Sequence, residues 1–594
     1  MKKIIFTLLL FLIFPKSTYA NEISVVSDTT YNLDTGAVTH VIHSISIDNQ
    51  ESGKYASDFI LRLHDIEPFN ITANENKIPL ATSLIEEGES KSIIVNFVKK
   101  NLGNQNVKNF QIEYDLMGVA AKSGDVWELN LPKLAENNIF SIYNTKVVVP
   151  RTFGDEAYID PEPIIFESTD TSNIYHFDKQ QLEQSRVIGA FGDFQSYLVD
   201  ITYHLENPLS KNTKIEIAIP PDTDFQRSSI LEINPEPIDI RSDQDGNWIA
   251  IYTLTPRQQL DVAASVLIDI FPVSRNIDLP KDDYLWSLTH ETEYWDYGSI
   301  DPLPDHLDTP RRIYDFVLRE LNYDYKKIGT NVKRIGASNA LLNPSSAICT
   351  EYSDATVALL RRAGIPAREI QGFAYSENAV SEPISLVEDV LHSWVEYWDT
   401  DRHMWVQIDP TWDDTSTEDY FNNFDLKHIT FVRHGTDSLK PFPPGSYNYG
   451  STPQKDVSVS IRELGTESKQ SSQIVYKVSN TIPFLRSNLS IEVKNIGNTA
   501  IYDENLEIYH DGTLVDEFTI SELLPFSSTF INTKMPFSLS GSELPDNVSI
   551  RYADSMVKIP TQKSLTTYIN ITVILLFLFM VLMFLFYKAR SLRK

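Results

Sequence analysis

The chain has 594 residues, which is too long for one hydrophobic core and predicts about three to five domains. Its composition is 42% hydrophobic, 11% aromatic and 22% charged, which is typical of folded protein and excludes a wholly disordered chain. The formal net charge of −30 disfavours nucleic acid and anionic lipid as partners, because both repel an acidic surface.

Both ends of the chain carry apolar segments, and the two differ in length. Residues 1–20 have two lysines before a short apolar segment and small residues at its end, which predicts a secretory signal peptide. Residues 568–587 carry no charge and are long enough for one transmembrane helix. A basic tail follows at 588–594, so the positive-inside rule places the C-terminus in the cytoplasm. We therefore expect a single-pass protein of the cell membrane whose N-terminal ectodomain lies outside.

Most of the expected ectodomain consists of short alternating or apolar segments separated by turn residues, which predicts strands. We expect a β-sandwich-like domain at 21–150 and a second β-rich domain at 151–280. In the second, Asp243, Asp245, Gly246 and Asn247 stand between two alternating segments. Their spacing loosely suggests a calcium loop, but the downstream glutamate of an EF-hand is missing. Asp-Gly between alternating segments is the usual signal of a β-hairpin, which is the favoured interpretation.

The pattern changes near residue 305, where apolar residues begin to recur at helical spacing. Thr309 and Pro310 predict a helix start, and helices and strands follow in an α+β domain at 281–440. Strands return at 452–560, where the segment 489–530, with its Asn495-Ile496-Gly497-Asn498 and Asp511-Gly512 turns, resembles Ig-like adhesion modules. The expected fold class is therefore a multidomain, mostly β protein with one α+β domain and one C-terminal transmembrane helix.

The chain has one cysteine, Cys349, so it cannot form an internal disulfide. A lone cysteine of an exported protein is a buried small hydrophobe, an intermolecular link or a reactive thiol. Apolar residues at helical spacing predict a buried helix starting near it: Ile348, Tyr352, Ala355, Leu359 and Ala363. Ser345 or Ser346 is the expected N-cap, and Gly364 the residue after the C-cap. At a helix start, unpaired N–H groups favour a thiolate and can stabilise an oxyanion.

A predicted hairpin then brings a histidine and an aspartate together. With a turn centred between Thr400 and Asp401, His392 stands directly opposite Asp409, within reach of an imidazole–carboxylate hydrogen bond. A slip of one residue would put the two on opposite faces. The residues also have plain structural interpretations, since His392 could be a satisfied strand histidine and Asp409 the start of a turn.

These residues resemble the motifs of the transglutaminase-like superfamily, relatives of the papain-type thiol enzymes. The resemblance covers about residues 308–415 and rests on Cys349, Arg362-Ala363-Gly364-Ile365-Pro366-Ala367-Arg368, His392-Ser393-Trp394 and Asp409-Pro410-Thr411. Gly372 also fits, whereas Ala347 replaces a glycine that is common in the family. The resemblance implies a papain-like core in which Cys349, His392 and Asp409 are the catalytic nucleophile, base and orienting carboxylate.

The resemblance also implies a thiol enzyme that acts on amide bonds of proteins or peptides outside the cell through a thioester. Water would resolve the thioester by hydrolysis and an amine by acyl transfer, and the family favours hydrolysis. The alternative is a non-catalytic surface binding or scaffold protein with a degenerate domain. No cofactor and no metal site are expected, because neither His-Glu-x-x-His nor paired cysteines occur in the sequence.

Overall fold

The computed structural model describes residues 23–592, except for 51–54, 65, 88–89, 103–105, 136–138, 278, 298–305, 328–332, 376–391, 417, 450–454, 463–467, 480–486, 539–542 and 562. The predicted signal peptide at 1–20 lies outside the described residues. The chain divides into two compact units, Met1–Gly192 and Asp193–Lys594. Strands dominate both units, which confirms the mostly β class.

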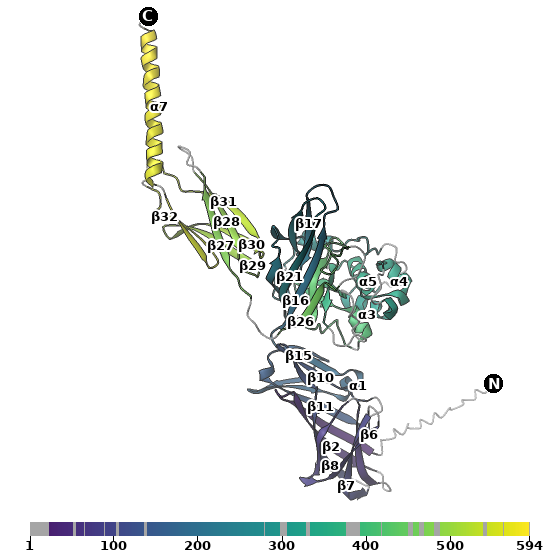
Figure 1. The fold of residues 1–594 in the computed structure, drawn as a ribbon. Helices are drawn as coiled ribbons and strands as arrows, with labels where there is room; N and C mark the ends of the chain where they lie inside the picture. The colour runs from purple at the N-terminus through teal and green to yellow at the C-terminus, as the bar shows by residue number, and fades with distance from the viewer. Residues whose placement is uncertain are drawn as a thin grey trace, which may run out of the picture. The chain divides into compact units, whose positions relative to one another are not determined.

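The N-terminal unit contains three β-sheets, purple to blue in Figure 1, with the strand orders β13-β14-β11-β1-β2-β8-β4-β5, β12-β15-β10-β9 and β3-β7-β6. Its elements are β1 (Ile23–Leu33), β2 (Val38–Asn49), β3 (Tyr55–His64), β4 (Phe69–Glu75), β5 (Ile78–Pro79), β6 (Ala81–Glu87), β7 (Ser90–Leu102), β8 (Asn106–Met117), β9 (Ala120–Ser123), β10 (Val126–Leu131), β11 (Ile142–Pro150), η1 (Arg151–Phe153), β12 (Glu156–Asp160), β13 (Ile165–Ser168), β14 (Ser172–Phe177), α1 (Lys179–Gln184) and β15 (Val187–Phe191). One cluster of buried apolar side chains connects all three sheets. Strands after residue 150 complete two of these sheets, since β14 pairs with β11 and β15 with β10.

The second unit begins with a pair of sheets that we call the middle β module: residues 193–270 together with β26. Their strand orders are β18-β21-β16-β26 and β17-β20-β19. The strands are β16 (Gln195–Glu206), β17 (Thr213–Ile219), β18 (Gln226–Asn234), β19 (Asp239–Ser242), β20 (Trp248–Leu254), β21 (Gln259–Ile270) and β26 (Val457–Ile461). Because β26 pairs with β16 from far along the chain, residues 271–456 are an insertion into this module.

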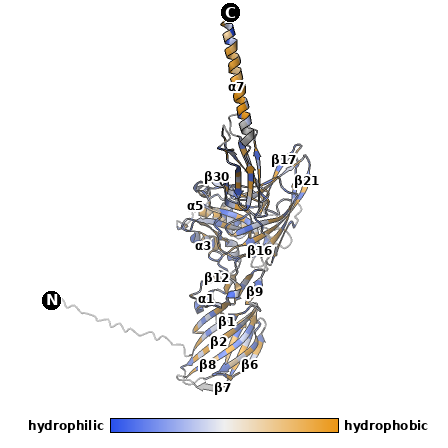
Figure 2. Cartoon of the chain, turned by 90° about the vertical axis from the view of Figure 1, so that its left-hand side faces the viewer, coloured by the Kyte–Doolittle hydropathy of each residue, from blue (hydrophilic) through white to orange (hydrophobic). Residues whose placement is uncertain are grey.

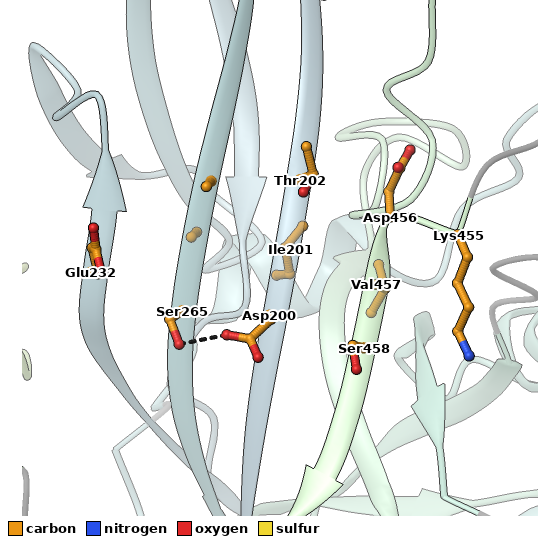
Figure 3. A pocket seen from close by; sticks show the side chains of 11 residues that line it. Asp200, Ile201, Thr202, Glu232, Ser265, Lys455, Asp456, Val457 and Ser458 are labelled. Carbon is orange, nitrogen blue, oxygen red and sulfur yellow. Dashed lines mark hydrogen bonds between the residues drawn. The ribbon is translucent and has the colours of Figure 1, made fainter.

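Figure 3 shows β26 beside β16 along a shallow hollow on the face of this sheet. Asp200 on β16 accepts a hydrogen bond from the Ser265 hydroxyl on β21 at 2.7 Å, and Ser458 lies on the neighbouring β26. All the residues that line the hollow belong to the middle β module or to the segment directly before β26, and none to the strands and helices of the inserted domain.

The predicted hairpin at 243–247 is confirmed, because it joins β19 to β20. Asp243 Oδ1 accepts the backbone N–H groups of Asp245 and Asn247, at 2.9 Å each, and Gly246 supplies the required positive φ of 79°. The Asp245 carboxylate accepts the N–H of Gly435 in the inserted domain at 3.1 Å. These carboxylates therefore stabilise a turn and an interdomain contact.

The inserted domain has the predicted α+β composition, with a sheet of order β24-β23-β22-β25. Its elements are α2 (Asp282–Ser287), α3 (Pro310–Glu320), η2 (Tyr325–Lys327), α4 (Ala337–Leu342), η3 (Pro344–Ser346), α5 (Cys349–Arg362), β22 (Ala367–Ala374), β23 (His392–Asp399), β24 (Met404–Ile408), α6 (Pro410–Thr415) and β25 (His428–His434). Helices α3, α4 and α5 gather together (Figure 1), and α5 packs against β22 and β23 of this sheet. Thr309 caps α3 and Pro310 is its first residue, as predicted. Helix α5 is buried along nearly its whole length and contributes to the apolar cluster of this domain.

Two side-chain amides of the middle β module cover the edge strand β25. Gln226 accepts the N–H of Thr430 at 2.8 Å and donates to its carbonyl at 3.0 Å. Asn247 accepts the N–H of Arg433 at 2.7 Å and donates to its carbonyl at 2.8 Å. Both amides are buried, so each takes the place of a backbone partner on a neighbouring strand. The sheet of the inserted domain therefore ends against the middle β module.

The C-terminal part has two sheets, β27-β28-β31 and β30-β29-β32-β33, that share one apolar cluster. Its elements are β27 (Ser472–Val478), β28 (Asn488–Asn495), β29 (Ile501–His510), β30 (Thr513–Leu523), β31 (Ser528–Lys534), β32 (Asn547–Tyr552), β33 (Ser555–Pro560) and α7 (Lys563–Ser591). Within the described part of the chain, α7 is the one helix long and apolar enough to cross a membrane, over Tyr568–Ser591. Figure 2 shows hydrophobic residues along most of the described length of α7.

Candidate active site

Helix α5 begins at Cys349, which therefore lies in its first turn as predicted, but the N-terminus is held differently from the prediction. Ser345 and Ser346 lie in the preceding η3 turn, so the prediction that one of them caps the helix was wrong. The Glu351 carboxylate instead accepts the N–H of Ile348 at 3.1 Å, because the chain enters the helix in an extended conformation. Cys349 is 7% exposed at the helix start.

A buried charge cluster fixes α5 against the sheet. Arg334 donates to Asp354 on α5 at 3.0 Å and to Glu369 on β22 at 2.8 Å. Ser393, the neighbour of His392, donates to the same Glu369 at 2.8 Å. The two carboxylates have no exposed surface, so removal of the arginine would leave both in the interior without its charge. This cluster links the helix that carries the cysteine to the strand that carries the histidine.

The β23–β24 hairpin brings His392 and Asp409 together in a register different from the predicted one. The prediction of directly opposite residues was wrong by two positions, since Val395 pairs with Ile408. The loop has four residues rather than two, and Asp399 stabilises it by accepting the N–H groups at 401 and 402, at 2.9 and 3.0 Å. A shift of two residues keeps every side chain on its face. His392 Nε2 therefore still donates to Asp409 Oδ2, at 2.6 Å.

Asp409 lies just beyond β24, where it is the N-cap of α6. Its Oδ1 accepts the N–H groups of Thr411 and Trp412 at 2.8 and 3.2 Å, which leaves Oδ2 for the imidazole. Burial raises the pKa of Asp409, but the charges and hydrogen bonds of His392 and His428 outweigh it and hold the pKa well below its ordinary value. Asp409 is therefore an ionised carboxylate with a fixed orientation.

The ring of His392 connects this carboxylate to the cysteine. Because Nε2 is bonded to Asp409, Nδ1 is the nitrogen available to Cys349, whose sulfur hydrogen-bonds the ring. Burial lowers the pKa of His392, but Asp409 and then Cys349 outweigh burial and raise the pKa to about 9. At neutral pH the ring is thus protonated, and it faces the sulfur of Cys349 with an N–H group that can donate to it.

A second histidine, His428 at the start of β25, was not singled out in the sequence. Its Nε2 donates to the same Asp409 Oδ2 at 3.1 Å, and its Nδ1 donates to Asp425 Oδ1 at 2.7 Å. Burial lowers the pKa of His428, but Asp425 and Asp409 raise it to about 9. A single histidine in an alternating strand has no local signal that distinguishes it from a core residue.

Aromatic rings enclose the two histidines. His392 stacks between Trp394 and Trp412, with ring centroids at 6.0 and 5.1 Å. Gly372 is required behind this stack, because a Cβ there would lie 2.7 Å from the Trp394 ring and 2.0 Å from a backbone oxygen of β25. The aromatic wall excludes water and restricts ring rotation, which strengthens the imidazole–carboxylate hydrogen bond.

By residue type, His392, Asp409 and His428 could also hold a metal ion, since one ligand atom from each lies within 4.8 Å of the others. The two nitrogen–oxygen distances of 2.6 and 3.1 Å are those of hydrogen bonds in which both rings donate to one carboxylate oxygen. This arrangement favours a proton-transfer site.

Comparison with known proteins gives a family match over part of the chain. The sequence profile of the transglutaminase-like superfamily matches residues 298–410. A protein-glutamine gamma-glutamyltransferase of Pseudomonas aeruginosa strain PAO1 is 35% identical over 78 residues, which are 13% of this chain and 12% of that protein. The chain therefore spans only about an eighth of the length of this curated relative.

Two solved structures also overlap with the chain. A candidate cysteine protease from Cytophaga hutchinsonii is 16% identical and covers 47% of this chain and 93% of its own, with a TM-score of 0.31. The periplasmic domain of TgpA from Pseudomonas aeruginosa, bound to ethylmercury, is 17% identical and covers 37% and 91%, with a TM-score of 0.22. The profile match and the curated relative show that this chain carries a domain of the transglutaminase-like superfamily at residues 298–410.

Proposed function

We propose that the chain is a membrane-anchored thiol enzyme that acts on amide bonds of proteins or peptides outside the cell, with Cys349 as nucleophile, His392 as base and acid, and Asp409 as the orienting carboxylate. One observation carries the proposal. His392 hydrogen-bonds Asp409 through Nε2 at 2.6 Å and faces the sulfur of Cys349 with its other nitrogen. This is the arrangement that nucleophilic acyl chemistry requires.

The reaction follows from the order of these groups. The Cys349 sulfur attacks the amide carbonyl carbon, and the first N–H groups of α5 stabilise the developing oxyanion. The C–N bond breaks as His392 gives its proton to the leaving nitrogen, which leaves a thioester on the sulfur. Water then attacks the thioester and passes a proton to the ring, which releases a carboxylic acid and leaves the sulfur as a thiolate beside the imidazolium. Hydrolysis is the outcome that we assign.

Turnover and thiol labelling test the proposal together. Because Cys349 is the only cysteine, an iodoacetamide probe reports on this residue alone. We expect Cys349→Ala to abolish both labelling and release of amine or ammonia from peptide substrates. His403→Gln, on the exposed loop of the same hairpin, is the matched control for His392→Gln and should keep wild-type activity. Unchanged turnover in Cys349→Ala, or a thiol with ordinary reactivity in the wild type, would instead support a scaffold with a degenerate domain.

Transfer to an amine is the second candidate, favoured by the name of the curated relative, which is a protein-glutamine gamma-glutamyltransferase. The same thioester would be attacked by a primary amine instead of water, which forms an isopeptide bond. Incubation of a glutamine peptide with a fluorescent primary amine separates the two outcomes. A carboxylate product in the presence of excess amine supports hydrolysis, and a fluorescent conjugate supports transfer.

We further propose that α7 anchors the chain in the cell membrane, with the preceding domains outside. The apolar stretch Tyr568–Ser591 has the length that a bilayer requires, and Lys588 and Arg590 lie at its C-terminal end, which supports a cytoplasmic tail. Protease treatment of intact cells should remove the folded domains and leave a membrane fragment with α7. A full-length chain that resists protease until the cells are lysed would contradict this orientation.

A further inference from the structure

We propose that His428 is a positioning residue of this site: a doubly protonated imidazole that joins Asp425 to Asp409 and clamps the Asp409 carboxylate for His392. The inference rests on the proposed function of Cys349 and His392, and it adds a second histidine and a second carboxylate to their reaction. His428 lies in β25 and Asp425 shortly before it, so both are outside the matched segment at 298–410.

The geometry sets the charge of the ring. His428 Nδ1 lies 2.7 Å from Asp425 Oδ1, and Nε2 lies 3.1 Å from Asp409 Oδ2. Ionised carboxylates only accept hydrogen bonds, so both nitrogens of His428 must carry protons and the ring is a cation. All three side chains are buried, which strengthens these charge-assisted bonds.

The cation acts on both Asp409 and His392. Oδ1 is held by the N–H groups of α6, and Oδ2 accepts from His392 and His428 together, so the carboxylate cannot rotate. The positive ring also lies 5.5 Å, centroid to centroid, from the ring of His392. Repulsion between the two cations lowers the proton affinity of His392, which helps it to release its proton to the leaving nitrogen.

The remaining groups around His428 do not cancel this charge. The aromatic rings of Trp394, Trp412 and Phe424 surround it, with centroids at 5.0, 4.7 and 4.5 Å. Tyr420 has its ring centroid at 5.9 Å and donates its hydroxyl to Asp425 at 3.2 Å.

Other ionisable groups act on His428 through these partners. Lys427 stabilises the ionised form of Asp425. Cys349 acts through His392. Glu418 Oε2 also lies 3.2 Å from the Tyr420 hydroxyl and shares its proton with Asp425. Among the described residues, Asp425 and Asp409 are the two carboxylates that hydrogen-bond the ring directly.

The middle β module determines where His428 lies. His428 is the first residue of β25, whose outer edge is held by the amides of Gln226 at Thr430 and of Asn247 at Arg433. Tyr197 on β16 also donates to the carbonyl of Leu426, two residues before His428, at 2.9 Å. A neighbouring module thus supplies the surface on which part of the site is assembled.

A matched pair of substitutions tests the inference in the full-length protein. Glutamine places an amide near the position of Nε2, so His428→Gln keeps a neutral donor toward Asp409. Asparagine reaches only as far as Nδ1, so His428→Asn keeps a donor toward Asp425 alone. Asp425→Asn removes the second carboxylate and with it the reason for the positive charge. The measurements are kcat/KM against pH on a peptide substrate and thermal melting of each variant.

We expect kcat/KM of His428→Asn to fall roughly 10- to 100-fold below that of His428→Gln, the effect of one hydrogen bond to a charged group. The alkaline limb of the plot of kcat/KM against pH should move to higher pH by about one unit in both His428→Gln and Asp425→Asn. Each substitution removes the cation near His392 and so raises the pKa of that ring. A residue with only a structural role would change the melting temperature and leave the alkaline limb in place.

The outcomes separate this inference from the proposed function. Two results would overturn the role of His428 alone, provided that the wild-type protein turns over substrate. One is an equal kcat/KM in His428→Gln and His428→Asn. The other is an alkaline limb that stays in place in Asp425→Asn. Wild-type protein without turnover and with an inert Cys349 overturns both. If His428→Asn does not fold, Asp425→Asn still decides the matter through its pH profile.

Discussion

The contact between the middle β module and β25 can be tested by Asn247→Asp, which changes hydrogen-bond donors without changing shape. Asn247 Nδ2 donates to the Arg433 carbonyl at 2.8 Å and to Asp243 Oδ2 at 3.0 Å. Aspartate would place a second acceptor against both oxygens in a position with 0% exposure. Replacing the buried donor to the Arg433 carbonyl by an acceptor costs about 3 kcal/mol, or about a hundredfold in the equilibrium for local opening of β25.

Hydrogen exchange of the peptide that contains β25 (His428–His434) measures this opening directly, because Asn247 holds the N–H of Arg433 and Gln226 holds the N–H of Thr430. We expect about a hundredfold faster exchange there in Asn247→Asp, together with a loss of turnover. Asn505→Asp, which removes one exposed hydrogen bond to Glu517 in the C-terminal part, is the matched control and should change neither. Wild-type exchange in Asn247→Asp would refute the argument that the amide holds the edge of the sheet.

Three further predictions follow from buried groups. Burial lowers the pKa of His43 to about 3 from 6.5, so the N-terminal unit should lose on the order of 5 kcal/mol of its free energy of unfolding as pH falls from about 6.5 toward 3. In His43→Gln, this pH dependence of stability should be absent when acid unfolding is measured. Arg334→Met leaves Asp354 and Glu369 buried without the arginine and should lower the free energy of unfolding by about 3–5 kcal/mol. Denaturant unfolding of Arg334→Met with and without Glu369→Gln measures this loss. Gly372→Ala puts a Cβ 2.0 Å from a backbone oxygen of β25, so we expect loss of turnover together with faster exchange across β22 and β25 than in the wild type.

Local sequence patterns were sufficient for several parts of the site. Helical periodicity and the Gly364 turn predicted a helix that starts near Cys349, and α5 spans Cys349–Arg362 with Gly364 at a φ of 78°. Strand alternation predicted that His392 and Asp409 share a face, and this held although the loop is two residues longer than expected. A register shift by an even number of residues keeps each side chain on its face of the sheet, whereas the residue that it pairs with depends on the length of the loop.

The sequence by itself thus determined the single thiol, the helix that begins with it, the face shared by His392 and Asp409, and a C-terminal apolar helix. These features depend on residues only a few positions apart, through periodicity, capping and turn chemistry. The tertiary structure alone decided that His428 shares the carboxylate of Asp409 and that Gln226 and Asn247 hold β25 from 204 and 186 residues away. No local pattern encodes such pairs, because they exist only once separate strands of the inserted domain and of the middle β module have packed together.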